Sequence, residues 1–402
     1  MPAHLLRASR LFTPDEEILD GALLIEDQKI IRIGPREAMR LPAKAMETNL
    51  GDRILAPGFV DIHVHGAGGH DVMEATPEAL CTIARALACH GTTSFLTTTV
   101  TASPHETDHS LAGMARYIES DVNRQPGRAQ IAGIHLEGPF INVARRGVHP
   151  LEHITEPSLP RYHAMLTASA GHAKIITLAP ELPGASALIR QAIADGLIVS
   201  LGHTDATYAV AAAAIEQGAR HATHVFNAMR PFHQREAGVL GAVLTDSRVT
   251  AELIADGLHV DLAALRLSLA AKGAANIVLV SDGTAATGMP DGAYRLGNFN
   301  ITVTGGVCRD SEGRLAGSTL TLDRAVSKIV EAGASRPGRS VTLAQAWAMA
   351  SSQPAARLGL SSKGSLAAGG DADIVVLVPS SDPTVPACFT VDRVMARGTW
   401  VE

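Results

Sequence analysis

The stretch APGFVDIHVHG, residues 56–66, decides the fold of this chain. It reads as a short apolar strand from Gly58 to Ile62 that ends in His63 and His65. Residues i and i+2 of a strand point to the same face, so the two imidazoles project side by side from the strand end. Neutral imidazole is the commonest metal ligand in proteins. The stretch therefore predicts a metal site at the end of a buried strand; the alternative is two histidines on an ordinary loop.

Composition limits the possible partners. The chain has 402 residues, a net charge of −6 and a pI near 6.3, which argues against nucleic acid or an anionic membrane surface as the main partner. The sequence contains no apolar window of the length that a membrane span needs, so we expect no membrane-spanning helix. The cysteines make no CxxC pair and no disulfide framework, which suits a reducing, cytoplasmic location. They are Cys81, Cys89, Cys308 and Cys388.

The middle of the chain, residues 56–360, alternates short apolar runs with Ala-rich helical stretches. This rhythm indicates repeated strand–helix units and a parallel sheet. The predicted strands are 57–62, 93–100, 130–136, 174–180, 197–202, 221–226, 249–255 and 276–281. Eight such units make a TIM-type (β/α)8 barrel, so we expect an α/β fold whose site lies at the carboxyl ends of the strands.

The two chain ends differ from the middle. Residues 22–34 read as a hairpin with its turn near Asp27 and Gln28, and residues 373–378 and 391–401 read as strands. We expect residues 1–55 plus 361–402 to form one small β-sandwich domain beside the barrel domain of residues 56–360.

Metal-ligand side chains recur where later barrel strands end. They are Glu137 after the third strand, His203 after the fifth, His224 at the sixth and Asp282 after the eighth. With His63 and His65 they make four imidazoles and two carboxylates, a set that suits zinc or ferrous iron. Six ligands exceed one tetrahedral site and are enough for two metals bridged by a carboxylate and water. We therefore expect one or two divalent ions per subunit.

Three neighbouring side chains leave alternatives open. His135 shares a strand face with Glu137 and could be the ligand in its place. His221 lies farther from the strand end than His224, which favours a structural role. Asp205 could cap the helix that follows it instead of binding metal.

Several stretches carry a resemblance to a known family. They are APGFVDIHVHGAGGHDVM, GIHLEGPFIN, LGHTDAT, THVFNAMRPF, ADGLHV, SDGTAATGMPDGAYRLG and LAGSTLTLDRAV. The chain resembles the N-acetylglucosamine-6-phosphate deacetylases of the amidohydrolase superfamily. The matching stretches span about residues 55–330, and both chain ends resemble the family's split β-sandwich. FNAM and ADGLHV are more specific than the metal ligands, which many amidohydrolases share.

The resemblance implies a role for each matching residue. The implied metal ligands are Glu137, His203 and His224, with His63 and His65 as a second-metal pair. The implied catalytic residues are Asp282 and His149, and the latter also lies against the substrate. The implied substrate and phosphate contacts are Asn227, Ala228 and His259. Arg235 matches an arginine that, in similar proteins, reaches the phosphate in the neighbouring subunit of a homodimer.

The resemblance also implies the reaction. It is hydrolysis of the N-acetyl group of a small phosphosugar, N-acetylglucosamine 6-phosphate, to glucosamine 6-phosphate and acetate. Two enzyme alternatives stay open: the same reaction on another hexosamine 6-phosphate, such as the galactosamine form, and a different amidohydrolase reaction. A barrel without catalytic chemistry is the non-enzyme alternative, and it would lack a ligand or the aspartate. None is missing here.

The chain departs from many members of the family at three positions. Gln234 and Ala237 alter the loop around Arg235, where His and Pro are common. Gly283 follows the catalytic aspartate, where alanine is common. We expect these changes to bear on substrate preference more than on the chemistry.

Overall fold

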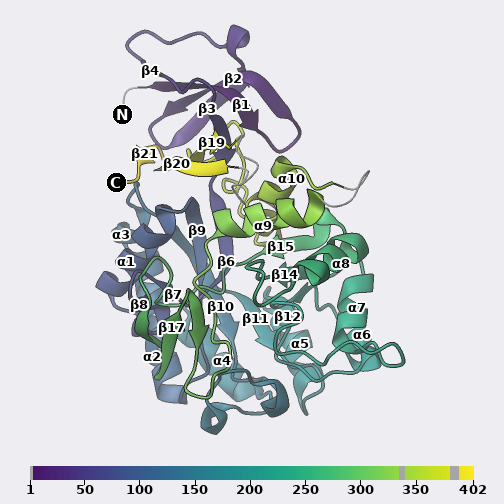
Figure 1. Ribbon diagram of the computed structural model, residues 1–402. Coiled ribbons are helices and arrows are strands. Elements are labelled where there is room, and N and C mark those ends of the chain that lie inside the picture. The colour runs from purple at the N-terminus through teal and green to yellow at the C-terminus, as the bar shows by residue number, and fades with distance from the viewer. Residues whose placement is uncertain (1–2, 335–339, 381–388) are drawn as a thin grey trace.

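A parallel eight-stranded barrel forms the centre of the structure (Figure 1). The computed structural model describes residues 3–334, 340–380 and 389–402, so Cys388 lies outside the described residues. The barrel strands are β6 (Phe59–Val64), β9 (Thr92–Thr98), β10 (Gln130–Glu137), β11 (Ala173–Leu178), β12 (Ile198–Leu201), β13 (His221–Ala222), β14 (Thr250–Leu253) and β15 (Ile277–Leu279). They pair in chain order from β6 to β15. The predicted α/β barrel is confirmed.

The sixth strand is much shorter than predicted. The sequence suggested residues 221–226, whereas β13 ends at Ala222. His224 and Phe226 have φ angles of 27° and 82°, in the left-handed region that no strand adopts. The chain therefore turns within the predicted strand, and this turn aims the His224 side chain.

The barrel closes between its first and last strands. Val64 and Gly283 form a parallel bridge, and the Asp282 N–H donates to the His63 carbonyl at 3.0 Å. The His65 N–H donates to the Gly283 carbonyl at 2.8 Å. Closure thus places the HxH pair beside Asp282, although 217 or more residues separate them in the chain.

Helices cover the outside of the barrel (Figure 1). They are α1 (Pro77–Ala88), α2 (Pro104–Glu119), α3 (Asp121–Arg124), α4 (Leu159–Ala168), α5 (Ala185–Ala194), α6 (Tyr208–Glu216), α7 (Gly238–Thr245), α8 (Leu262–Lys272) and α9 (Leu322–Ala334), followed by α10 (Leu343–Ala348) and α11 (Ser352–Arg357). In α1, Thr76 caps the first turn, Pro77 stands at its start, and Leu80, Ile83 and Leu87 recur at helical spacing and are buried. None of the helices in the described ranges is long and apolar enough to cross a membrane.

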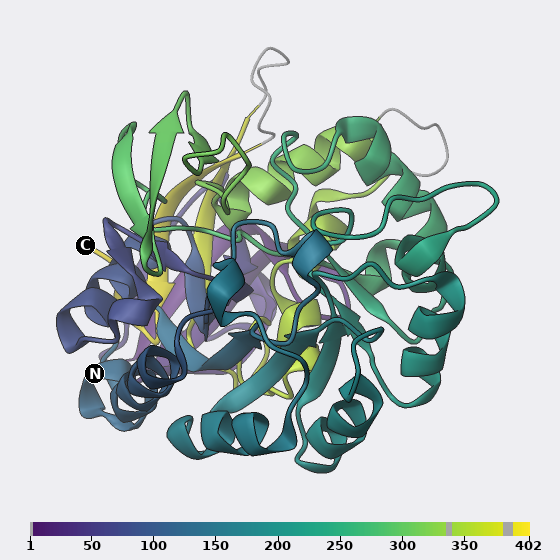
Figure 2. The same ribbon diagram turned by 90° about the horizontal axis from the view of Figure 1, so that it is seen from below.

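A three-stranded antiparallel excursion separates β15 from α9. Its strands are β16 (Gly292–Leu296), β17 (Phe299–Thr304) and β18 (Val307–Arg309). In Figure 2, which views the barrel from the side opposite the terminal strands, this green excursion stands at the edge of the open barrel face. Asp71, in the short pair β7 (Gly66–Ala67) and β8 (His70–Asp71), accepts a hydrogen bond from the Gly297 N–H at 2.8 Å. This bond ties the excursion to the loop after the first barrel strand.

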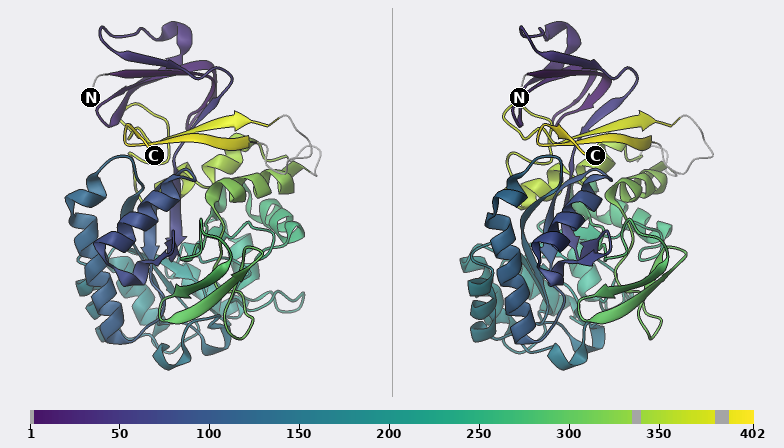
Figure 3. Two further views of the ribbon diagram at one scale, coloured as in Figure 1. Left: turned by 60° about the vertical axis from the view of Figure 1, so that its left-hand side comes forward. Right: turned by 90° about the vertical axis from the view of Figure 1, so that its left-hand side faces the viewer.

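Both chain ends contribute to one hydrogen-bonded sheet. Its strands are β1 (His4–Phe12), β2 (Glu17–Glu26), β3 (Lys29–Pro35), β4 (Met46–Asn49), β5 (Ile54–Pro57), β19 (Ile374–Pro379), β20 (Phe389–Ala396) and β21 (Thr399–Trp400). β5 lies between β1 and β19, so the pairing of the two ends is confirmed. Figure 3 shows the yellow C-terminal strands between the purple N-terminal strands and the barrel.

Trp347 packs at the junction between this sheet and the barrel. Its side chain is 1% exposed, stacks on Phe59 with a ring-centroid distance of 4.3 Å, and donates from Nε1 to the Pro57 carbonyl at 2.8 Å. Pro57 ends β5 and Phe59 begins β6, so one indole covers the point where the chain passes from the sheet into the barrel.

Candidate active site

The carboxyl ends of the barrel strands deliver the predicted ligands to one place. His63 belongs to β6, Glu137 ends β10, and the other members follow their strands. His203, His224 and Asp282 have φ angles of 47°, 27° and 50°. Such left-handed backbone is uncommon outside glycine and concentrates at functional sites, where it aims a side chain. Here it turns three ligand-type side chains inward at the strand ends.

The first ligand triangle joins Glu137, His203 and His224. His224 Nε2 lies 3.1 Å from His203 Nε2 and 3.1 Å from Glu137 Oε1, and His203 Nε2 lies 3.3 Å from Glu137 Oε1. For bonds of about 2.0–2.1 Å, ligands of a tetrahedral zinc ion lie about 3.3 Å apart. These separations match the edges of such a coordination sphere.

The second triangle joins His63, His65 and Asp282. Its edges are 3.2 Å between the two Nε2 atoms, and 3.4 and 3.1 Å from these atoms to Asp282 Oδ1. Glu137 Oε2 lies 3.4 Å from the Nε2 atom of each histidine. The two oxygens of Glu137 therefore face different triangles, which is the placement of a bridging carboxylate.

Hydrogen bonds fix the tautomers of three of these histidines. Nδ1 of His203 lies 2.9 Å from the Arg145 carbonyl, and Nδ1 of His65 lies 3.1 Å from the Thr98 carbonyl. A carbonyl only accepts, so both Nδ1 atoms carry a proton, and each ring in its neutral form presents the lone pair of Nε2 to the centre. Nδ1 of His63 similarly donates to Glu252, at 3.0 Å. These donors fit a divalent metal ion.

A cavity of about 170 Å³ opens beside the two triangles. Its wall includes the predicted substrate contacts His149, Asn227, Ala228 and His259. Leu296, the last residue of β16, and Gly317 also line the cavity. The site thus combines a metal-ligand floor with polar walls large enough for a small molecule.

Comparison with known proteins identifies the family. A family model described as "Amidohydrolase family" matches residues 54–401. A curated N-acetylglucosamine-6-phosphate deacetylase from Lysinibacillus sphaericus is 37% identical over 354 residues, covering 88% of each chain. A curated N-acetylgalactosamine-6-phosphate deacetylase from Escherichia coli O157:H7 is 39% identical, covering 93% of this chain and 95% of its own. A mutant N-acetyl-D-glucosamine-6-phosphate deacetylase from Mycobacterium smegmatis, solved with N-acetyl-D-glucosamine-6-phosphate, superposes with a TM-score of 0.90 at 37% identity over the full length of both chains.

The chain belongs to the amidohydrolase family. This amidohydrolase is a hydrolytic enzyme, and its His, Glu and Asp cluster is that of a divalent-metal site. The recognition made from the sequence motifs is confirmed, as are the fold class and the enzyme class.

Charges inside the cluster keep the carboxylates of this amidohydrolase ionised. Burial opposes ionisation of Asp282, but the hydrogen bond to His65 and the nearby imidazolium charges lower its pKa to about 2. Burial also disfavours charge on His65, yet hydrogen bonds to Asp282 and Glu137 raise its pKa to about 9. Burial lowers the pKa of His203 to about 4, so this imidazole is neutral and keeps its lone pair. The carboxylates are available to a cation throughout the physiological pH range.

His259 presents its ring to the cavity, and Asp256 favours the imidazolium form of that ring. Its Nδ1 donates to Asp256 Oδ2 at 2.6 Å, and the ring lies in the cavity wall. Burial disfavours the imidazolium form, but the bond to Asp256 outweighs burial and raises the pKa of His259. A positive donor of this kind suits an anionic group on the ligand.

Arg235 does not line this cavity. It lies in the exposed loop between α6 and α7, which projects from the barrel at the lower right of Figure 1. Its N–H donates to His233 Nδ1 at 3.3 Å. The two substituted positions, Gln234 and Ala237, belong to the same loop and lie equally outside the cavity wall.

The structure places the three residues whose roles the sequence left open. His135 contacts the Ile62 carbonyl and Thr177 inside the barrel, at 3.1 and 2.7 Å, and does not take the place of Glu137. Asp205 accepts from Arg145 at 2.8 Å, and Thr207 is the cap of α6. His221 lies inside the barrel with its Nε2 against Glu252, which is a structural contact.

Gly283 holds a closely packed position. A Cβ added there would lie 2.8 Å from Thr287 Oγ1 and 3.1 Å from Ser281 Oγ. Its carbonyl accepts from the N–H groups of His65 and Gly66, at 2.8 Å each. Glycine therefore lets the chain pass closely beside Asp282 without loosening the turn.

Sequence reasoning missed Glu252 and Thr101. Glu252 is a carboxylate in the apolar strand run Val249–Ala255, and a charged side chain in a buried barrel strand was the signal that could have found it. Thr101 follows the second strand and contacts His149 through both its N–H and its hydroxyl. No motif marks such a contact, because 48 residues separate the partners.

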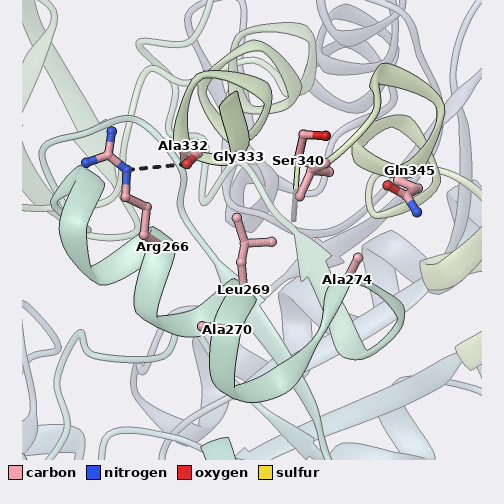
Figure 4. A pocket seen from close by; sticks show the side chains of 9 residues that line it. Arg266, Leu269, Ala270, Ala274, Ala332, Gly333, Ser340 and Gln345 are labelled. Carbon is pink, nitrogen blue, oxygen red and sulfur yellow. Dashed lines mark hydrogen bonds between the residues drawn. The ribbon is translucent and has the colours of Figure 1, made fainter. Parts of the chain in front are cut away.

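A second cavity, of about 240 Å³, lies between α8, α9 and α10 (Figure 4). Its described lining contains one charged side chain, Arg266, whose Nε donates to the Ala332 carbonyl at 3.3 Å. The rest of that lining is Leu269, Ala270, Ala274, Gly333, Ser340, Val341 and Gln345. These described residues include no histidine, cysteine or carboxylate, so this second cavity lacks the side chains that bind a metal ion.

Proposed function

We propose that this amidohydrolase removes the acetyl group from N-acetylglucosamine 6-phosphate, giving glucosamine 6-phosphate and acetate. The observation that carries the proposal is the cavity itself, in which metal-type ligands, the carboxylate of Asp282 and the ring of His259 face one small space. Relatives of 34–37% identity over 88% or more of this chain bear the name of that deacetylase.

The two ligand triangles support a site for two divalent ions, zinc or ferrous iron, with Glu137 between them. Glu137, His203 and His224, whose ligand atoms lie 3.1–3.3 Å apart, would hold one ion, and His63, His65 and Asp282 the other. When bound, such an ion lowers the pKa of water toward about 7 and polarises a carbonyl group.

Asp282 is the proposed proton carrier. Its Oδ1 lies 3.1 Å from His65 Nε2 in the second triangle, and the residue lines the cavity. It takes the proton of the attacking water as general base and delivers it to the leaving amine as general acid. The amine must be protonated to leave, so one carboxylate between both positions serves both steps.

His149 is the proposed donor to the acetyl oxygen. Its Nδ1 accepts from the Thr101 backbone N–H at 3.2 Å, so its Nε2 carries the ring proton. That Nε2 lies 3.7 Å from Glu137 Oε2, at the edge of the ligand cluster. A hydrogen bond from it would strengthen as negative charge develops on the carbonyl oxygen.

The phosphate group would be recognised from one side of the cavity. His259 and the Asn227–Ala228 backbone lie in the wall, and Arg235 of a neighbouring subunit would supply a further positive charge. Because Arg235 would come from the neighbouring subunit, the active form in this proposal is a homodimer. A cytoplasmic location accords with the phosphosugar substrate and the scattered cysteines.

The galactosamine counterpart is a second candidate substrate. The E. coli relative of that name is 39% identical over 93% of this chain. The two substrates differ in the orientation of one hydroxyl group, which no residue named above distinguishes.

Acetate release tests the proposal directly. We would assay N-acetylglucosamine 6-phosphate, N-acetylgalactosamine 6-phosphate and unphosphorylated N-acetylglucosamine, with the metal content counted per chain. Preferred turnover of the first substrate and a need for its phosphate are the expected result. Preference for the second would assign the galactosamine reaction, and turnover without phosphate dependence would contradict the assigned phosphate contacts.

A further inference from the structure

Glu252 is a buried carboxylate that the proposed reaction does not use. It lies on β14 and has 0% exposure. Its Oε1 lies 2.8 Å from His221 Nε2, and its Oε2 lies 3.0 Å from His63 Nδ1. Burying a carboxylate costs free energy unless the group is paired and hydrogen-bonded. The contacts of Glu252 with two histidines therefore indicate its role.

The bond from His63 to Glu252 sets the orientation of the His63 ring. An ionised carboxylate only accepts, so Nδ1 carries a proton, and the neutral ring then presents the lone pair of Nε2 to the second ligand triangle. The Nε2 atom then faces Asp282 Oδ1 and Glu137 Oε2, at 3.4 Å each.

His63 is held differently from the other two histidines with a fixed tautomer. His203 and His65 donate from Nδ1 to backbone carbonyls, whereas His63 donates to a charged side chain. A carboxylate partner orients an imidazole and increases its basicity as a metal ligand.

The same Glu252 oxygen also reaches the first triangle. Oε2 accepts from the His224 backbone N–H at 3.1 Å, where the backbone has a φ angle of 27°. One carboxylate oxygen thus holds the side chain of a ligand in one triangle and the main chain of a ligand in the other.

We infer that Glu252 is a positioning residue that orients His63 and sets the metal affinity of the second triangle. This inference rests on the proposed two-ion site. Through the His224 main chain, Glu252 also supports the first triangle, but the first triangle keeps all three of its side-chain ligands without it.

Zinc binding tests the inference on the full-length protein. Apo-enzyme would be titrated with Zn²⁺ in competition with a chromophoric chelator, for the wild type, Glu252→Gln and Glu252→Ala. We expect two sites in the wild type, and an about 10–100-fold weaker second site in Glu252→Ala with the first site retained. Glu252→Gln keeps the shape and an accepting oxygen, so its second site should lie between these two.

His221→Gln is the matched control, because it changes the other partner of Glu252 and touches no ligand. It should leave both zinc sites near wild-type affinity, and thermal unfolding of each apo-variant reports any general loss of stability. If Glu252→Ala folds poorly, the isosteric Glu252→Gln still gives the comparison.

Two results would overturn the inference. One is unchanged affinity of the second site in both Glu252 variants. The other is a wild type that binds a single zinc ion at saturation while releasing acetate from N-acetylglucosamine 6-phosphate. This second result would leave the proposed deacetylase function standing and remove the role of Glu252 alone.

Discussion

The backbone N–H of Thr101 donates to Nδ1 of His149 at 3.2 Å. The Thr101 hydroxyl lies 2.8 Å from the same nitrogen, so it also points its proton there. Nδ1 therefore has no proton of its own, and the ring proton lies on Nε2, toward the ligand cluster. The main chain alone fixes this tautomer.

His149→Ala should lower kcat about 100–1000-fold, because it removes a donor to the developing oxyanion. Steady-state kinetics of acetate release and the metal content per chain would be measured together. Thr101→Val keeps the backbone N–H, so it should lose far less activity than His149→Ala. Equal losses in the two variants would contradict the assigned tautomer.

Asp282→Asn should lower kcat by about 100–10,000-fold, because it removes the group that carries the proton to the leaving amine. The amide keeps an oxygen beside His65 and so preserves the local packing. Pre-steady-state and steady-state acetate release would be compared with the wild type. Near-normal turnover would contradict the role of proton carrier.

Glu137→Gln should weaken metal binding in both triangles, because the two oxygens of Glu137 face different triangles. Metal content after dialysis, measured by elemental analysis, should fall well below that of the wild type. Glu216→Gln is the control, since Glu216 is an exposed carboxylate that accepts from Arg248 at 2.6 Å and lies on α6, away from the two triangles. Loss of one ion alone in Glu137→Gln would argue against a bridging position.

Arg235→Ala should raise KM for N-acetylglucosamine 6-phosphate about 10–100-fold, the range of a lost charge-assisted hydrogen bond. KM for the unphosphorylated sugar should change little, because the arginine is assigned to the phosphate. An unchanged KM for the phosphorylated substrate would remove Arg235 from the site.

Mixing two impaired variants tests the subunit that Arg235 serves. In a mixed dimer of Arg235→Ala and Asp282→Asn, one site would have its own Asp282 and an Arg235 from the other chain. Activity at low substrate concentration should therefore exceed that of either variant alone. No gain on mixing, with dimer exchange confirmed, would show that Arg235 acts within its own subunit.

Lys272 should make stability depend on pH above neutrality. The side chain is 7% exposed and donates to the Val243 carbonyl at 2.6 Å. Burial lowers its pKa from 10.5 to about 8. Below pH 8 this lysine is charged in the folded and unfolded states, and folding bears the full burial penalty. Between pH 8 and 10.5 the unfolded chain binds more protons, so the free energy of unfolding should rise with pH.

Urea unfolding of the wild type and Lys272→Met at pH 7.5 and pH 10 would measure this effect. The difference in stability between the two proteins should move by about 1–2 kcal/mol in favour of the wild type at the higher pH, allowing for partial solvent screening. A difference that is the same at both values would show that Lys272 keeps its ordinary pKa when folded.

The barrel could be predicted because each strand carries a local signal. The apolar runs before His63 and before Glu137 were predicted as strands 57–62 and 130–136, and the structure ends β6 two residues later, at Val64, and β10 one residue later, at Glu137. The β13 prediction was too long, because left-handed backbone at His224 and Phe226 is a property of the turn and leaves no periodic trace. The β16–β18 excursion was not predicted either, although β16 lies inside the motif SDGTAATGMPDGAYRLG that contains Asp282.

The site shows the same division between local signals and distant contacts. The ligand types and their positions after the strands were readable, and the structure brings the predicted ligands together. Glu252 was missed because its meaning lies in contacts with residues 189 and 31 positions away. A buried acid in a strand predicts that a partner exists, but it does not name the partner.

The sequence by itself determined the donor set, the strand order and the family, because these follow from residue type, local periodicity and motifs. The tertiary structure alone decided that Glu137 faces both triangles, that Thr101 sets the tautomer of His149 and that Glu252 holds His63. Each of these depends on distances of about 3 Å between side chains from different strands. Barrel closure sets such distances, and it is a property of the whole sheet that no single stretch of sequence specifies.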